Sequence, residues 1–176
     1  MTAPSWTIRR LHTVDAAALD GLIDVLTDCV EGGASVSFML PFARERAEAF
    51  WSRVARDVAA GERALLVAED ECGICGTVQL VLDVPENQPH RADLAKMLVH
   101  RRARRRGLGA ALMRAAEATA RDCRRTLLVL DTVTGGDAER LYEGLGWSRV
   151  GVIPRYALMP DGAPCDTTVF FRDLRS

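Results

Sequence analysis

The sequence lacks the features that mark several specialised classes of protein. Its 23 basic and 24 acidic residues leave a net charge of -1, so a surface built throughout for nucleic acid is not indicated. No apolar run approaches the roughly 18 residues of a membrane helix, and residues 1–10 lack the apolar core of a signal peptide. These absences favour a cytoplasmic protein. Lysine is almost missing too: the chain has 22 Arg, and Lys96 stands alone.

The five cysteines do not form the regular framework of a small disulfide-stabilised protein. A chain of this length buries on the order of two-thirds of its unfolded surface, which is enough for a core without disulfides or metal. We therefore expect one domain over residues 1–176. Cys72-Gly73-Ile74-Cys75 has the spacing of half a zinc site, but no second pair or nearby His supplies the other ligands. No metal site is predicted.

Hydrophobic periodicity predicts an alternation of strands and helices, hence an α/β protein. The apolar residues of 126–131 are nearly continuous, which is typical of a strand covered on both faces. Helices are predicted over 14–30, from residue 42 to Gly61, from Leu108 onward and over 138–144. Strands are predicted over 6–11, 64–69, 75–84, 92–99, 126–131, 147–153 and 167–172.

The connection after the strand ending at Val99 carries the clearest chemical pattern. Gly107-Leu108-Gly109 opens an amphipathic helix, where unpaired backbone N–H groups and the helix dipole favour an anion. The run Arg104-Arg105-Arg106 adds positive potential, although five Arg in the six positions 101–106 also fit a solvated loop. No Gly-Lys-Ser/Thr follows, and Leu112 stands where a dinucleotide fingerprint requires glycine. The turn therefore predicts a phosphate site of another kind.

Two motifs in this order resemble the GNAT N-acetyltransferase superfamily. The first is Arg104-x-x-Gly107-x-Gly109 after the strand that ends Met97-Leu98-Val99, and the second is the segment 141–147, LYEGLGW. The resemblance implies a GNAT fold, in which a mixed sheet of six or seven strands, flanked by about four helices, is splayed between the strands ending at Val99 and Asp131. Acetyl-CoA is expected in that cleft.

The resemblance also implies residue roles. Tyr142 corresponds to the tyrosine that protonates the departing thiolate or orients the thiol; as a phenol it stays neutral at pH 7. Gly135 stands where the family often has an Asn, so one side-chain contact to the cofactor is expected to be absent. The pantetheine arm is expected along Met97, Leu98 and Val99, and the pyrophosphate on the amides of Arg104, Arg105, Arg106, Gly107, Leu108 and Gly109.

The acceptor amine must lose a proton before it attacks. Asp93 is our first candidate for the base, Asp131 is either a base or the group that holds the substrate ammonium, and His100 is a third candidate. Each carboxylate also has a structural interpretation, because Asp93 can pair with Arg91 and Asp131 can cap the turn that follows it.

Cys29 and Cys123 are candidate acyl-accepting nucleophiles, but neither has a partner base in its motif. We therefore expect direct transfer through a ternary complex of enzyme, acetyl-CoA and amine.

A closer resemblance is to the tabtoxin-resistance type of acetyltransferase, which acetylates the amino group of a small amino-acid-like toxin. It is carried by segments 32–39, 91–97, 130–132 and 151–162, and it places Asp93, Asp131 and Tyr142 at that group's catalytic positions. The Gly32-Gly33 loop lies on the acceptor side in such proteins, either as a lid or as an ordinary helix stop.

Several alternatives stay open at this point. The chain could be a protein Lys or N-terminal acetyltransferase, or a non-catalytic acyl-CoA sensor, and a nucleic-acid role for the Arg run is a distant further option. The sequence leaves the choice between monomer and homodimer undecided.

Overall fold

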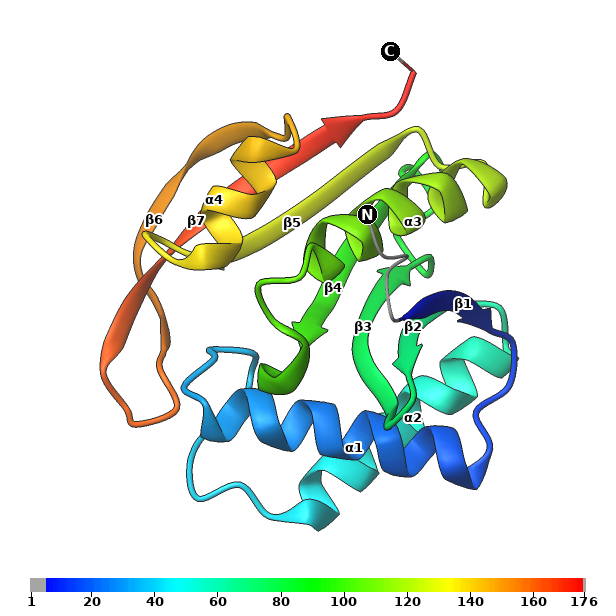
Figure 1. The fold of residues 1–176 in the computed structure, drawn as a ribbon. Coiled ribbons are helices and arrows are strands. Elements are labelled where there is room, and N and C mark those ends of the chain that lie inside the picture. Colours follow the sequence, from blue (N-terminus) through cyan, green and yellow to red (C-terminus); the bar gives the residue numbers. More distant parts are fainter. Residues whose placement is uncertain (1–5, 176) are drawn as a thin grey trace.

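The computed structural model describes residues 6–175, and within them seven strands form one sheet flanked by four helices (Figure 1). A short 3-10 turn, η1 (Arg101–Ala103), lies between β4 and α3. The strands are β1 (Thr7–Leu11), β2 (Arg63–Asp70), β3 (Gly73–Val81), β4 (Arg91–Val99), β5 (Leu127–Val133), β6 (Ser148–Leu158) and β7 (Pro164–Asp173). The helices are α1 (Ala16–Glu31), α2 (Arg44–Ala59), α3 (Leu108–Asp122) and α4 (Asp137–Gly144).

The local sequence explains how the first helix begins and ends. Asp15 caps α1, because its carboxylate accepts a hydrogen bond of 2.8 Å from the Ala18 N–H. Leu22, Ile23 and Leu26 form the buried face of the helix. Gly33, at φ +87°, adopts the left-handed conformation that stops a helix and that residues with a Cβ rarely adopt.

The sheet is splayed in its middle, which confirms the expected mixed GNAT architecture. The strand order is β1-β2-β3-β4-β5-β7-β6, and every neighbouring pair is antiparallel except β4–β5. That parallel pairing spans three residue pairs, from Arg91↔Leu127 to Asp93↔Val129. Beyond it β4 and β5 diverge, as Figure 1 shows. One edge of β4 therefore carries backbone groups that no neighbouring strand uses.

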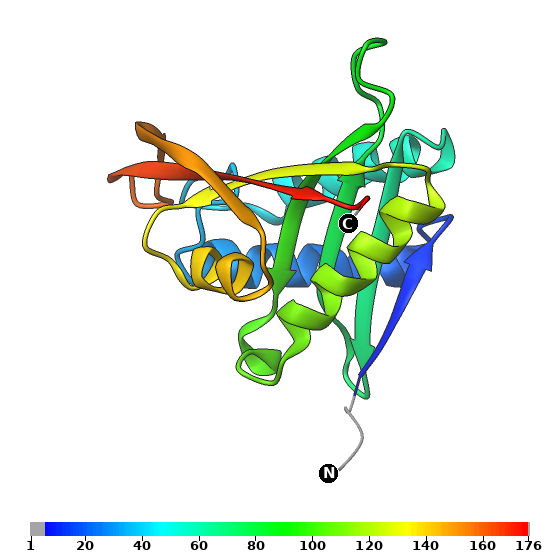
Figure 2. The same cartoon turned by 90° about the horizontal axis from the view of Figure 1, so that it is seen from above.

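The helices cover opposite faces of the sheet. Residues that alternate along β2 belong to two different cores, with Leu65 and Val67 packed on the α1–α2 side and Leu66 and Ala68 on the α3–α4 side. Figure 2 shows α3 on one side of β2–β4 and α1 on the other. The wedge between β4 and β5 thus opens between two well-packed layers.

The prediction that the fifth strand is covered on both faces was wrong. Leu128 and Leu130 are buried, whereas Leu127 and Val129 are only half-buried and Asp131 is exposed. The reason is that α1 and α2 pack on β2, β3 and β4, while α4 covers only one face of β5. Both C-terminal strands are longer than predicted, since the mostly exposed β6 has no apolar alternation to mark its length.

No helix in the described part of the chain is long and apolar enough to cross a membrane.

Candidate active site

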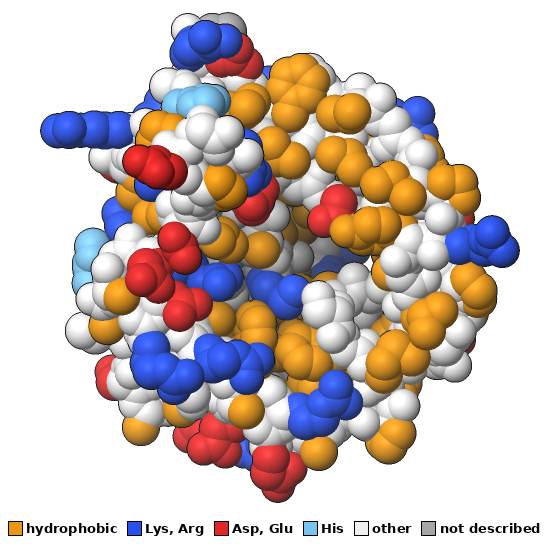
Figure 3. Space-filling view, turned by 180° about the vertical axis from the view of Figure 1, so that it is seen from behind, with side chains coloured by type: hydrophobic (Ala, Val, Ile, Leu, Met, Phe, Trp, Pro, Cys, Tyr) orange, Lys and Arg blue, Asp and Glu red, His pale blue; other side chains and the backbone are white. Residues whose placement is uncertain are grey.

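The wedge between β4 and β5 holds a cavity of about 1330 Å³, open to solvent. Its walls come from the two diverging strands, the α1–α2 loop over residues 32–39, the loop that opens α3, and the hairpin of β6 and β7. The space-filling view is hollowed near its centre, with Lys and Arg side chains beside the hollow (Figure 3). The volume exceeds the few hundred cubic ångströms of a typical small-ligand pocket. An elongated ligand and a second small molecule fit together.

One end of the cavity presents an array of free backbone donors. The N–H groups of residues 105–110 donate to no acceptor within residues 6–175, and they lead into the N-terminus of α3. Gly107 makes the turn possible, because its φ of +80° is left-handed and a Cβ there would meet open space. Free donors are therefore present at residues 105–109 of the predicted phosphate site and continue to Ala110, whereas the Arg104 N–H, which we also expected there, donates to the Arg101 carbonyl at 3.3 Å.

Gly109 also lies where α3 faces α4. A Cβ on Gly109 would lie 3.1 Å from Leu141 Cδ2, so the missing side chain allows α3 to approach α4 closely. The absence of a side chain leaves the space beside the loop open at Gly107, whereas at Gly109 it allows close packing of α3 against α4.

The arginines of the loop divide into two groups. Two of them anchor the loop: Arg101 pairs with the buried Asp28 at 2.7 Å, and Arg102 pairs with Asp70 and donates to the Ile74 carbonyl. Arg104 combines both roles: its Nε donates to the Val99 carbonyl at 3.0 Å, and its side chain lines the cavity.

The exposed Arg105 and Arg106 make no hydrogen bond or ion pair with any described residue. Among the arginines of this loop, the positive charge that is free to meet an anion thus lies in the turn itself. The interpretation of the whole run as a solvated loop does not fit Arg101 and Arg102, whose partners are nearly buried carboxylates.

Asp28 fixes the start of this loop from α1. Its carboxylate accepts from both the backbone N–H and the Nε of Arg101, at 2.8 and 2.7 Å. Burial alone would raise the pKa of Asp28, but the two hydrogen bonds from Arg101 and the charges of His100 and Arg101 outweigh it and lower the pKa. Asp28 therefore remains an anion at neutral pH and holds the backbone of Arg101 in place.

Tyr142 lies where the wedge meets α4. Its ring is buried against Trp147 and Phe170, yet the residue also lines the cavity. The hydroxyl makes no hydrogen bond to a described residue, so it is available to a ligand in the cavity. Burial raises the pKa of the phenol, and the nearby carboxylate of Asp131 raises it further. The group is a neutral donor throughout the physiological range.

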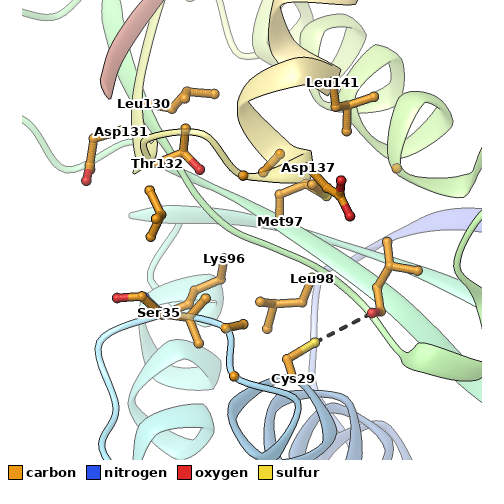
Figure 4. Close-up of a pocket in the computed structure, with 18 of the residues that line it drawn as sticks. Cys29, Ser35, Lys96, Met97, Leu98, Leu130, Asp131, Thr132, Asp137 and Leu141 are labelled. Carbon is orange, nitrogen blue, oxygen red and sulfur yellow. Dashed lines mark hydrogen bonds between the residues drawn. The ribbon is translucent and has the colours of Figure 1, made fainter. Parts of the chain in front are cut away.

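The two candidate carboxylates occupy different places. Asp131, at the open end of β5, lines the main cavity (Figure 4). Its carboxylate accepts a hydrogen bond of 3.0 Å from Thr167. Asp93 lies where β4 and β5 still pair, forms an ion pair with Arg91, and lines a smaller adjoining hollow that it shares with Asp131. The structure thus brings Asp131 and Tyr142 to one cavity and places Asp93 beside it.

The remaining candidates serve the scaffold. His100 caps η1, since its Nδ1 accepts from the Arg102 N–H at 3.2 Å, and it does not line the cavity. The Cys29 thiol lines the cavity but donates to the Val99 carbonyl at 3.6 Å (Figure 4), and burial raises its pKa. Cys123 lies outside the cavity beside Arg10. In the described part of the chain no group of three or more His, Cys, Asp or Glu residues could hold a metal ion.

Two features of the site escaped sequence reasoning. Gly135, the position that departs from the family pattern, donates its N–H to the buried Glu139, whose other oxygen accepts from Thr168 at 2.8 Å. In β4, one extra residue interrupts the ladder with β3, because Gln79 pairs with Ala95 while Thr77 pairs with Leu98. Gly135 and Glu139 are only four positions apart, but Thr168 is 29 positions from Glu139 and the bulge depends on the pairing with β3.

The comparisons with known proteins decide the family. A family model described as the acetyltransferase (GNAT) domain matches residues 61–149, just over half of the chain. A curated relative from Azospirillum brasilense, described as an uncharacterized N-acetyltransferase in the hisH-hisA intergenic region, is 34% identical over 127 residues. That match covers 71% of this chain and 74% of the relative. The chain belongs to the GNAT acetyltransferase family.

Solved GNAT structures agree with the fold. The structure of yncA from Salmonella typhimurium, which contains acetyl-CoA, has a TM-score of 0.78 at 19% identity and covers 97% of this chain and 94% of that one. A ribosomal-protein-alanine N-acetyltransferase from Brucella melitensis has a TM-score of 0.78 at 22% identity, with coverages of 95% and 99%. Acetyl-CoA is the co-substrate of the family. At identities this low the likeness establishes the fold alone, so the acceptor amine has to be inferred from the residues of the site.

Proposed function

We propose that the chain transfers the acetyl group of acetyl-CoA directly to a primary amine of a small molecule. The observation that carries this proposal is the continuity of one cavity from the free amides of residues 105–110 to Tyr142 and Asp131. The free amides, a neutral proton donor and a carboxylate thus share the lining of one cavity. This combination suits a ligand that carries both a diphosphate and a thioester.

The residues present fit acetyl-CoA at three points. The N–H groups of residues 105–110, with Arg105 and Arg106 beside them, would hold the pyrophosphate. The free edge of β4 at Met97–Val99 would pair with the amides of the pantetheine arm, as an added strand does. The thioester then supplies an activated acyl group near the hydroxyl of Tyr142.

Tyr142 acts in this proposal as a hydrogen-bond donor to the leaving sulfur. Its pKa is raised above the ordinary value near 10, and thiols have pKa values near 8.5. Complete proton transfer from the phenol to the thiolate is therefore uphill, whereas a hydrogen bond from the neutral phenol stabilises the negative charge that develops there.

Asp131 is the carboxylate best placed for the amine. It is exposed at the mouth of the main cavity, and its partner Thr167 leaves the second carboxylate oxygen available. Asp131 attracts the substrate ammonium and accepts the proton that nitrogen must lose before it attacks. Asp93, paired with Arg91, reaches the same proton through water in the hollow it shares with Asp131.

The atoms of the transfer balance within the ternary complex. The amine nitrogen forms a bond to the carbonyl carbon, the carbon–sulfur bond breaks, and the proton released by nitrogen ends on the carboxylate or the sulfur. Cys29 does not intervene, because burial raises its pKa and keeps the thiol protonated.

We further propose that the acceptor is an amino-acid-like toxin or antibiotic of the tabtoxin kind. We also propose a cytoplasmic location for the protein.

Calorimetry and a thiol-release assay test the proposal together. We expect saturable acetyl-CoA binding, and thiol release that is accelerated by small amines from a panel of amino acids, polyamines and aminoglycosides. Preference for a peptide pool over every small amine would replace the proposal with protein acetylation. Tight binding without acceleration by any amine would replace it with an acyl-CoA sensor. Absence of saturable binding would overturn it.

A further inference from the structure

The single lysine of the chain lies in the acceptor half of the cavity. Lys96 projects from the bulge in β4 and lines the wedge together with Ser37 and Asp131 (Figure 4). Everywhere else the chain uses Arg for positive charge, 22 times. The position of this one ammonium is therefore a local feature of the site, and the mechanism above assigns it no role.

Lys96 has no counter-ion among the described side chains around it. Its Nζ donates to Ser37 Oγ at 3.1 Å and lies 5.6 Å from the centre of the Phe50 ring. No carboxylate within residues 6–175 lies within 4 Å of it. Burial and the charge of Arg63 lower its pKa, while Asp131 opposes the shift. The net shift of the pKa is downward, so an ammonium here lacks part of the stabilisation it has in water, and only the cation–π contact with Phe50 and the charge of Asp131 oppose that loss.

The backbone at this contact is strained on both sides. Lys96 has a φ of +50° and Ser37 a φ of +79°, both in the left-handed region that residues with a Cβ rarely adopt. The two strained residues come from different elements and meet through the Nζ–Oγ hydrogen bond. Strain of this kind persists where the surrounding structure enforces it, and it concentrates at ligand sites. The fold thus holds this ammonium at a fixed place.

We infer that Lys96 binds an anionic group of the acceptor, in the simplest case a carboxylate. This inference rests on the proposed function. A half-buried ammonium with one protein partner has two N–H donors left, and a ligand anion satisfies them and supplies the missing counter-charge. Asp131 on the facing strand attracts the amine end of the same molecule. The acceptor is therefore zwitterionic, with its amine toward Asp131 and its anion toward Lys96.

Matched acceptor pairs test this inference. Each pair consists of an α-amino acid and its carboxamide, which differ in the charge at the carboxyl carbon. Because the carboxylate also raises the pKa of the α-amine, thiol release is measured over a range of pH, and kcat and KM are compared for the free-base amine of both. For wild-type protein we expect kcat/KM for the acid to be about tenfold or more above that for the amide, as a charge-assisted hydrogen bond implies. We expect Lys96→Met to remove that preference by raising KM for the acid, with kcat and the values for the amide nearly unchanged.

Two further variants separate charge from structure. Lys96→Arg keeps the charge and should recover part of the preference, whereas Arg121→Met removes one charge from the exposed end of α3 and should leave it intact. Acetyl-CoA affinity and the thermal midpoint of Lys96→Met verify that the protein remains folded. Equal rates for acid and amide in wild type, or an equal loss for both in Lys96→Met, would overturn the inference while leaving acetyl transfer in place. Failure of every amine would overturn both proposals.

Discussion

A single methyl group at Gly107 tests whether the turn before α3 binds acetyl-CoA. In Gly107→Ala the added Cβ meets no atom within 4 Å, so any effect comes from the left-handed backbone at φ +80°. Placing a residue with a Cβ there costs about 1–2 kcal/mol. If the loop relaxes and loses one amide contact to the pyrophosphate, the Kd for acetyl-CoA rises about tenfold or more, because hydrogen bonds to charged groups contribute about 1.5–3 kcal/mol.

Gly61 provides a matched control. Its φ of +76° and its open surroundings are nearly the same, but it lies after α2, away from the cavity lining. Both variants should lower the thermal midpoint by about 2–8 °C in a chain of this size, since each kcal/mol corresponds to about 2–4 °C. Calorimetry should show weaker acetyl-CoA binding for Gly107→Ala alone. Unchanged affinity in Gly107→Ala, with the loss of stability present, would refute the assignment of the anion site.

Two other predictions concern the chemistry and the anchoring of the loop. Tyr142→Phe should lower kcat about 10- to 100-fold, the loss of one hydrogen bond to a charged group, while acetyl-CoA binds as before; an unchanged kcat would remove Tyr142 from the mechanism. Asp28→Asn should lower the free energy of unfolding by about 1–3 kcal/mol at pH 7, since it weakens a buried charged contact. Because the folded pKa of Asp28 lies below its ordinary 3.8, its contribution is complete above that pH and disappears as pH falls through the folded pKa. Urea denaturation of both proteins at pH 7, 4 and 3 should therefore give curves that converge in acid, and a constant difference would contradict the role of the charge.

Local patterns in the sequence predicted the parts of the site that depend on neighbouring residues. The strand, the turn with Gly107 and the following helix are consecutive along the chain, from Arg91 to Asp122, so propensity and capping rules apply to them directly. The order of elements predicted the splayed sheet through the family resemblance. The catalytic assignments of Asp93, Asp131 and Tyr142 remain predictions.

Pairings between distant residues could not be predicted. The loop arginines look alike in sequence, but Arg101 meets Asp28 73 positions away and Arg102 meets Asp70 32 positions away. Which arginine stabilises the loop and which stays free is decided by tertiary contacts alone. The exposed face of β5 could not be predicted for the same reason. Nothing in the apolar run of β5 shows that α1 and α2 pack on β2, β3 and β4 and leave that face uncovered.

The two anchored arginines determine how the turn meets its ligand. Arg101 fastens one end of the loop to α1, and Arg102 fastens it to the connection between β2 and β3, before any phosphate arrives. The donors of residues 105–110 are thereby preorganised, and association does not bear the entropy of ordering a flexible loop. Discrimination between acyl donors must then come from the thioester end of the wedge, since the diphosphate end is rigid and is common to every coenzyme A ester.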